Sequence, residues 1–318
     1  MVSPSDRPAA GLLTAAGRRA LDGLLTAWAA VSVTFFALRL AGGDPVASLL
    51  AQGLASSEQA AALRHQLGLD LPLLQQYLRF LGGLLRGDLG RSLYTGQPVT
   101  RIIGEQIPYT AQLAAAGLFV ALGLGLVLGL LAAGEDRGRR FPVASGIAGI
   151  ATALPVAFTG ILAILAATRL GLASVSDPAT LRSLGLPALV LGFASAGAVA
   201  RLMQAGMQET LAAPFMLAAR ARGLRRGPRL LWHALRPALP PVVSLIAIEA
   251  AFLFGGTVVT ETVFSRPGLG RLLVGSILQG DFPVAQGLVV LSALVYTLSH
   301  VAADTLGLIL DPRLRRTE

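Results

Sequence analysis

The chain has 318 residues, of which 54% are hydrophobic and only 14% are charged, whereas soluble domains carry about 25% charged residues. This deficit indicates a protein of the lipid bilayer. The net charge is +9, and all 26 basic residues are arginines, which excludes a phosphate-binding loop because that loop needs a lysine. The absence of cysteine excludes disulfides, thiolate catalysis and cysteine-based metal sites.

Six apolar segments are predicted to cross a membrane, because a spanning helix needs about 20 mostly apolar residues. The first is predicted to be an uncleaved anchor, since no small-residue cleavage site closes it. Together they predict an all-α integral membrane protein with six transmembrane helices. The segments cover residues 21–40, 109–133, 141–167, 184–203, 240–262 and 283–310.

The segment between the first two spans, residues 41–108, is predicted to be helical and external rather than a linker. Ser56 followed by Gln59 is a capping-box pattern that begins a helix. A second amphipathic helix is predicted from Leu71, with Pro72 in its first turn. Two helices are therefore expected on the outer face of the membrane.

Arginine placement predicts the orientation of the chain, because short loops rich in arginine remain cytoplasmic. Both tails, residues 1–20 and 311–318, and the loop at residues 204–239 are therefore predicted to be cytoplasmic. The arginines that carry this prediction are Arg7, Arg18, Arg19, Arg137, Arg139, Arg140, Arg220, Arg222, Arg225, Arg226, Arg229, Arg236, Arg313, Arg315 and Arg316.

The third span contains Pro155, which is expected to kink the helix and free a backbone carbonyl. Such breaks are tolerated where they face protein or a cavity, so Pro155 is a candidate for lining a translocation path. Glu249 lies about nine residues, or about 13 Å, into the fifth span. It is predicted either to line the path, or to pair with Arg201 or be protonated.

The arginine-rich loop is predicted to form a helix, a turn and a second helix. Pro214 suits the first turn and Gly223 the C-terminal cap of the first helix, with Phe215, Ala218, Ala219 and Arg222 near one face. A second helix is expected to restart at Gly227-Pro228 and to be bent by Pro237, Pro240 and Pro241 into the fifth span. Physical reasoning leaves three roles open for this loop. These are docking on a soluble partner, lying on the membrane as an interfacial helix held by anionic lipid, and only fixing the orientation of the chain.

The pattern Ala218-Ala219, three residues and then Gly223 resembles the EAA loop of ABC-transporter permeases, with Leu217 at the family's glutamate position. This departure removes the glutamate's polar contact without preventing docking. Further motifs, in the same order over nearly the whole chain after Leu21, resemble the B-type subunit of the dipeptide/oligopeptide/nickel permease family. They are Gly43-Asp44-Pro45, Leu67-Gly68-Leu69-Asp70, Gly87-Asp88-Leu89-Gly90-Arg91-Ser92, Gln97-Pro98-Val99, Glu261-Thr262-Val263-Phe264, Pro267-Gly268-Leu269-Gly270, Asp281-Phe282-Pro283 and Asp311-Pro312-Arg313.

The resemblance implies the transmembrane domain of a type I ABC importer in the bacterial cytoplasmic (inner) membrane, with its core over residues 109–310. A second homologous permease, two ATPases that hold ATP and Mg, and an external substrate-binding protein are the implied partners. No cofactor, metal or nucleic acid is expected in this chain. The implied ATPase-coupling residues are Phe215, Leu217, Ala218, Ala219, Arg220, Arg222, Gly223 and Leu224.

The implied solute is a peptide or a related small molecule, with dipeptide, oligopeptide, glutathione-like peptide and nickel chelate all open. Glu261 to Gly270 is expected to form a structured external turn that gates the path or meets the binding protein, or simply a capped re-entrant loop. Two other functions are compatible with the sequence: a proton-coupled secondary transporter with Glu249 as relay, and a scaffold whose basic loop recruits an acidic partner. An enzyme is not expected, because the sequence holds no nucleophile-base constellation.

Overall fold

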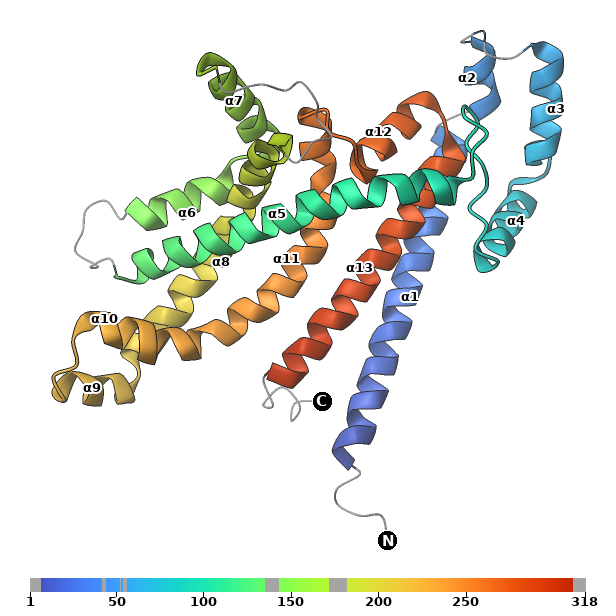
Figure 1. The fold of residues 1–318 in the computed structure, drawn as a ribbon. Coiled ribbons are helices and arrows are strands. Elements are labelled where there is room, and N and C mark those ends of the chain that lie inside the picture. Colours follow the sequence, from blue (N-terminus) through green and yellow to red (C-terminus); the bar gives the residue numbers. More distant parts are fainter. Residues whose placement is uncertain are drawn as a thin grey trace. The chain divides into compact units, whose positions relative to one another are not determined.

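The computed structural model describes residues 7–41, 44–51, 53, 56–134, 143–171 and 182–310. Within these residues the chain is helical apart from turns and one isolated antiparallel bridge between Arg91 and Pro98. The elements are α1 (Arg7–Ala41), α2 (Pro45–Ala51), α3 (Ser57–Leu67), α4 (Leu73–Leu85), α5 (Val99–Gly134), α6 (Val143–Ala153), α7 (Val156–Arg169), η1 (Arg182–Leu184), α8 (Gly185–Ala212), α9 (Pro214–Ala221), α10 (Arg226–Pro228), η2 (Arg229–Ala234), α11 (Leu235–Val263), α12 (Leu269–Gln279) and α13 (Phe282–Leu310) (Figure 1).

The chain divides into two compact units, which are described separately. Unit 1 comprises Met1–Tyr109 and Pro267–Thr297, and unit 2 comprises Thr110–Arg266 and Leu298–Glu318. Unit 1 therefore holds α1 to α4 and α12. Unit 2 holds α6 to α11, including the predicted cytoplasmic loop.

In unit 1, an aromatic cluster packs α4 against α1. The ring centroids of Phe35 and Phe80 lie 5.4 Å apart in a stacked arrangement, and Tyr77 lies 5.4 Å from Phe35 and 5.2 Å from Phe36. The hydroxyls of Ser32 and Tyr77 are hydrogen bonded at 2.6 Å. This cluster fixes which face of α4 meets the end of α1.

The segment at residues 41–108 confirms its predicted capping box. The Ser56 hydroxyl accepts a hydrogen bond from the Gln59 backbone N–H at 3.2 Å, and the Gln59 side chain accepts from the Ser56 N–H at 2.9 Å. Pro72 lies one position before the first turn of α4, as its N-cap residue, and not within that turn as predicted. The difference is a single residue because a proline fits either position, having no N–H to lose.

A turn between α4 and α5 is tied to the start of α13 within unit 1. The Ser92 hydroxyl donates to the Asp281 carboxylate at 2.5 Å, and both side chains are buried. The Tyr94 hydroxyl donates to the Gln279 carbonyl. These contacts join segments far apart in sequence.

Unit 2 is built on close helix packing at glycines, as expected of membrane proteins. A Cβ at Gly125 of α5 would lie 2.6 Å from Val199 of α8, and one at Gly192 of α8 would lie 2.5 Å from the Gly117 carbonyl oxygen. At Gly197, a Cβ would lie 2.6 Å from the Ala148 carbonyl oxygen of α6. Larger residues at these positions would force α5 and α6 away from α8.

Among the described residues, four helical stretches are long and apolar enough to cross a membrane: Leu21–Leu40, Val99–Ala133, Gly185–Ala212 and Phe282–Ala302. A fifth arises if α6 and α7, bent by 108°, count as one span. Helix α11 covers the predicted fifth span at 240–262. Helix α5 begins at Val99, earlier than the predicted start at 109, because Pro108 is accommodated inside it.

Prolines have two different effects in unit 2. The predicted break at Pro155 is confirmed, since α6 ends at Ala153, and Pro155 caps the start of α7. Helix α11 contains Pro240 and Pro241 without interruption, and the bend expected from these prolines stays a prediction. A π-helical turn precedes α11, with the Leu235 N–H bonded to the Leu230 carbonyl.

Candidate functional site

The predicted coupling helix is α9, and both of its ends are specified locally. Pro214 occupies the first turn, where its missing N–H costs nothing. At the other end, the N–H of Gly223 donates to the Arg220 carbonyl at 2.9 Å and the N–H of Leu224 to the Ala219 carbonyl at 3.2 Å. Gly223 has a φ of +76°, so the helix ends in a Schellman motif.

One face of α9 is anchored in the core of unit 2. Met216 is 1% exposed and joins a buried apolar cluster, and Ala219 is buried on the same face. The cluster brings together residues of α8, η2 and α11, which are Val199, Met203, Met207, Ala234, Ala238 and Val242. A displacement of α9 would therefore be transmitted directly to α8 and α11.

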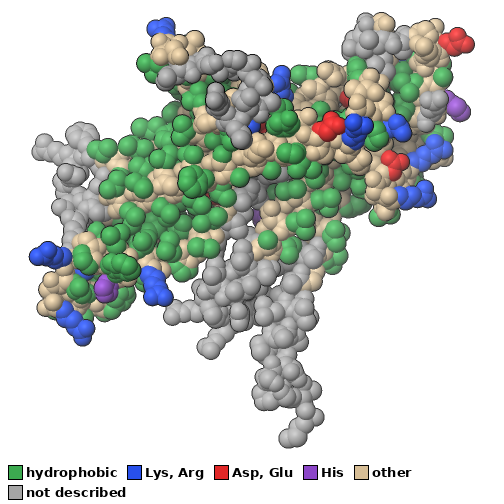
Figure 2. All heavy atoms as spheres, viewed as in Figure 1, with side chains coloured by type: hydrophobic (Ala, Val, Ile, Leu, Met, Phe, Trp, Pro, Cys, Tyr) green, Lys and Arg blue, Asp and Glu red, His purple; other side chains and the backbone are tan. Residues whose placement is uncertain are grey.

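The other face of α9 is open and carries both apolar and basic groups. Phe215 is 50% exposed and Leu217 61%, while Leu231 and Trp232 of the neighbouring η2 are 54% and 77% exposed. Ala218 is also exposed, as are the arginines that gather over α9 and α10, including Arg220, Arg222 and Arg225 (Figure 2). Apolar side chains surrounded by arginines suit a protein surface that offers an apolar groove with acidic edges.

The residues predicted near one face of α9 differ in burial. Ala219 is buried whereas Phe215, Ala218 and Arg222 are exposed. The residue that anchors the helix, Met216, was missed. In a chain whose lipid-facing and core-facing positions are both apolar, periodicity carries no signal that would have found it.

Glu249 lies on α11 and is partly buried. Its carboxylate is hydrogen bonded to the side chain of Ser195 on α8, and its buried Oε2 atom has no hydrogen-bond partner. Arg201 is exposed on α8, and no ion pair among the described residues joins it to Glu249. The structure thus brings Glu249 to a serine hydroxyl and not to the arginine that the sequence offered.

Glu261 is fully buried, at 0% exposure, near the C-terminal end of α11. Its Oε1 atom accepts a hydrogen bond from the Thr110 hydroxyl at 2.6 Å, and its carbonyl accepts from the Arg266 N–H at 2.9 Å. Arg266 is buried as well and donates to the Ser183 hydroxyl at 3.2 Å. The predicted turn after α11 is therefore a packed corner, while Pro155 is exposed at the start of α7.

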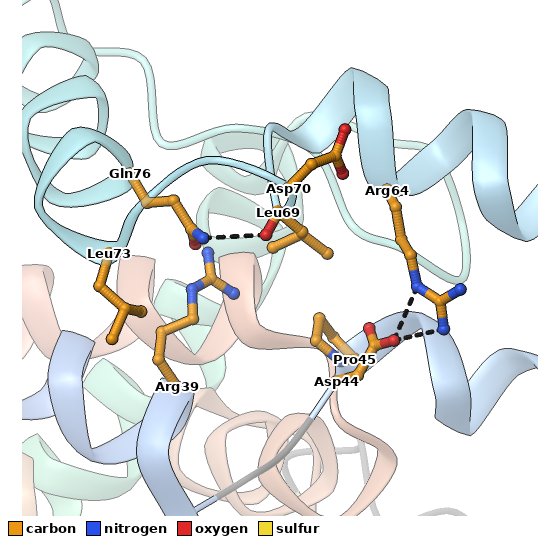
Figure 3. A pocket seen from close by; sticks show the side chains of 8 residues that line it. All are labelled: Arg39, Asp44, Pro45, Arg64, Leu69, Asp70, Leu73 and Gln76. Carbon is orange, nitrogen blue, oxygen red and sulfur yellow. Dashed lines mark hydrogen bonds and ion pairs between the residues drawn. The ribbon is translucent and has the colours of Figure 1, made fainter.

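Unit 1 contains an open cavity of about 540 Å³ where α1, α2, α3 and α4 meet. Sequence analysis did not predict it, because its lining residues come from separate helices and the turns between them. The lining residues are Arg39, Asp44, Pro45, Arg64, Leu69, Asp70, Leu73 and Gln76 (Figure 3).

Two family models match the chain. The model described as binding-protein-dependent transport system inner membrane component matches residues 125–316, and the model for the N-terminal part of such membrane components matches residues 13–114. The two matches together extend over both units.

Curated relatives match almost their whole length. The dipeptide transport system permease protein DppB of Lactococcus lactis is 33% identical over 294 residues, covering 92% of this chain and 96% of its own. The dipeptide permease DppB of Escherichia coli K12 is 32% identical, covering 89% and 93%. The glutathione transport system permease protein GsiC of Pectobacterium atrosepticum is 34% identical, covering 89% and 92%.

Proposed function

Because this chain belongs to the family of inner membrane components of binding-protein-dependent transport systems, we propose that it carries short peptides as one permease of an ATP-driven importer. Membership makes it a translocation-path subunit of an ABC importer with the type I transmembrane fold. The peptide substrate is proposed from the relatives, whose names specify dipeptides or glutathione, itself a short peptide.

The proposed assembly pairs this chain with a second, homologous permease. Two ATPase subunits bind ATP and Mg on the cytoplasmic side, and an external binding protein delivers the peptide. This chain then contributes a path and a coupling element but no catalytic group. In this proposed assembly, both termini and α9 lie on the cytoplasmic side. The α6–α7 pair forms the third span and α11 the fifth.

The observation that carries the proposal is the two-faced character of α9. Its open face presents Phe215 and Leu217 with the neighbouring arginines, which is the chemistry of a docking surface. Its inner face places Met216 among Met203 and Met207. Since packed cores switch between discrete arrangements, an ATPase that holds α9 differently with and without ATP would bias the positions of α8 and α11.

The test is a pull-down of the chain from its native membrane, comparing wild type with Gly223→Asp. Gly223 is exposed, has a φ of +76°, and a Cβ there would meet nothing within 4 Å. The substitution therefore strains the end of α9 and adds a negative charge without disturbing the core. Wild type should retain an ATPase containing a phosphate-binding loop, and Gly223→Asp should lose it.

Gly171→Asp is the matched control, because Gly171 also follows a helix, is exposed and has a φ of +66° with nothing within 4 Å of a Cβ. It should keep the ATPase. Loss of the ATPase from both variants would mean that general damage causes the effect. Retention by Gly223→Asp would mean that α9 is an interfacial helix held by lipid.

A further inference from the structure

The cavity of unit 1 contains a cation, Arg39, that forms no ion pair with any carboxylate in the described part of the chain. The Arg39 guanidinium lies over the rings of Phe35 and Phe282, at 5.3 and 5.8 Å from their centroids. Its Nε atom is buried and has no hydrogen-bond partner. The rings favour the positive charge, but they leave the planar donors of the guanidinium unused.

Gln76 adds an unpaired acceptor to the same cavity. Its amide nitrogen donates to two backbone carbonyls, those of Leu69 at 3.1 Å and Leu71 at 2.9 Å (Figure 3). Because both contacts require the N–H₂ group, the orientation of the amide is fixed, and its Oε1 atom is buried with no hydrogen-bond partner. Buried polar atoms of this kind are uncommon in folded proteins.

The other charged residues of the cavity differ in how fully they are paired. Asp44 and Arg64 neutralise each other, with Arg64 Nε and Nη2 donating to the Asp44 Oδ2 atom at 2.8 and 2.5 Å. Asp70 is bonded only to the exposed His65, at 2.9 Å, and is itself half-exposed. The cavity therefore offers one cation, Arg39, and one accessible carboxylate, Asp70.

We propose that this cavity is a binding subsite for a short zwitterionic peptide, with Arg39 binding the terminal carboxylate. The guanidinium fork matches a carboxylate in two parallel hydrogen bonds. The half-exposed Asp70 carboxylate then supplies an acceptor for the terminal ammonium. The cavity volume of about 540 Å³ lies within the range of about 300–1,000 Å³ found for small-molecule sites.

This inference rests on the proposed function, because it assigns to the importer a place where its peptide is held outside the spanning core. The aromatic cluster that packs α4 on α1 also sets Gln76 beside the end of α1, so the subsite is preformed. A preformed site binds without the cost of ordering its side chains.

The experiment uses the whole importer in nanodiscs of neutral phosphatidylcholine, without the binding protein. Saturation-transfer NMR would detect weak binding of dialanine and of dialanine amide, which lacks the carboxylate. We expect a dialanine signal for wild type, a weaker one for Arg39→Lys, which keeps the charge but not the fork, a much weaker one for the amide, and none for Arg39→Gln. Arg86→Gln, a change at an exposed arginine after α4, should bind like wild type.

Uptake into proteoliposomes with the binding protein gives a second measurement. Loss of one charge-assisted contact should raise the KM for dialanine about tenfold in Arg39→Gln, with the unfolding midpoint of the importer compared with wild type as a check on folding. An unchanged KM together with an unchanged NMR signal would overturn the subsite while leaving the importer intact. No peptide uptake by wild type would instead refute the proposed function.

A lipid headgroup is the competing occupant of Arg39. If dialanine gives no signal in neutral nanodiscs and native mass spectra show phosphatidylglycerol retained by wild type but not by Arg39→Gln, the cavity holds a lipid phosphate and the peptide subsite is wrong. If excess unlabelled dialanine displaces labelled dialanine from the importer and phosphatidylglycerol does not, the result supports the peptide subsite.

Discussion

Arg39 in unit 1 and Glu261 in unit 2 are both ionisable residues near the C-terminal end of a long apolar helix, yet their surroundings differ. The C-terminal end of a helix carries partial negative charge, so it favours Arg39 and disfavours Glu261. Glu261 is accordingly enclosed, with the Thr110 hydroxyl donating to it at 2.6 Å. Arg39 is contacted by aromatic rings and leaves Nε without a hydrogen bond.

This difference in surroundings distinguishes an ionisable group with a structural role, Glu261, from one that is available to a ligand, Arg39. A buried carboxylate in an unfavourable field survives only when its neighbours satisfy it, so Glu261 is assigned to holding α5 and α11 together. A guanidinium in a favourable field can persist with its donors unused. The sequence-based role of Glu261 in the path is therefore less well supported than the role of Arg39 in binding.

The largest effect is expected from disrupting the close packing of α5 on α8 at Gly125. In Gly125→Leu, the Cβ would lie 2.6 Å from Val199 Cβ and 2.9 Å from the Ala196 carbonyl oxygen. Neither a β-branched buried side chain nor a helix carbonyl can yield, so the cost should exceed about 3 kcal/mol. We expect no assembled permease in the membrane, as measured by fluorescence-detected size exclusion.

Gly123→Leu is the control for this change, since a Cβ at Gly123 meets nothing within 4 Å and the residue is exposed. It should assemble normally. Equal assembly of both variants would show that α5 and α8 are not closely packed at Gly125.

The next largest effect is expected from Glu261→Ala, which removes the 2.6 Å hydrogen bond from the Thr110 hydroxyl and opens a cavity. The expected loss is about 2–4 kcal/mol in the free energy of unfolding. The midpoint of thermal unfolding of the purified importer should fall clearly, whereas Glu209→Ala, at an exposed position of α8, should not change it. A stable Glu261→Ala variant with impaired uptake would assign Glu261 to the translocation path. Glu261 and Arg39 would then no longer differ as a structural residue and a ligand-binding residue.

Features that depend on neighbouring residues were predictable from the sequence. The capping box of Ser56 and Gln59, the break at Pro155 and the ends of α9 at Pro214 and Gly223 each follow from residues within one or two turns. The cavity was not predictable, because it brings Arg39 of α1 to Gln76 of α4 through an aromatic cluster that forms only on packing. The burial of Met216 and the continuity of α11 through Pro240 likewise depend on which helices lie against them.

Glu249 is intermediate between Glu261 and Arg39 in the hydrogen bonding of its charged group. One part of its carboxylate is bonded to Ser195, as Glu261 is to Thr110, while its Oε2 atom is unpaired, as Arg39 Nε is. Glu249→Gln keeps the size and the hydrogen bond to Ser195 but removes the charge. If the unpaired oxygen meets the ammonium group of a passing peptide, dialanine uptake should fall about threefold, the scale of a partly screened charge interaction, with the unfolding midpoint unchanged.

Ser195→Ala provides the matched change, because it removes the hydroxyl and leaves the Glu249 charge in place. It should lower the unfolding midpoint slightly while uptake is preserved. Unaltered uptake and unaltered peptide preference in Glu249→Gln would assign Glu249 to the structural class with Glu261. An unpaired carboxylate oxygen in a spanning helix would then be insufficient to identify a solute contact, and the assignment of Arg39 would depend on its own binding measurement alone.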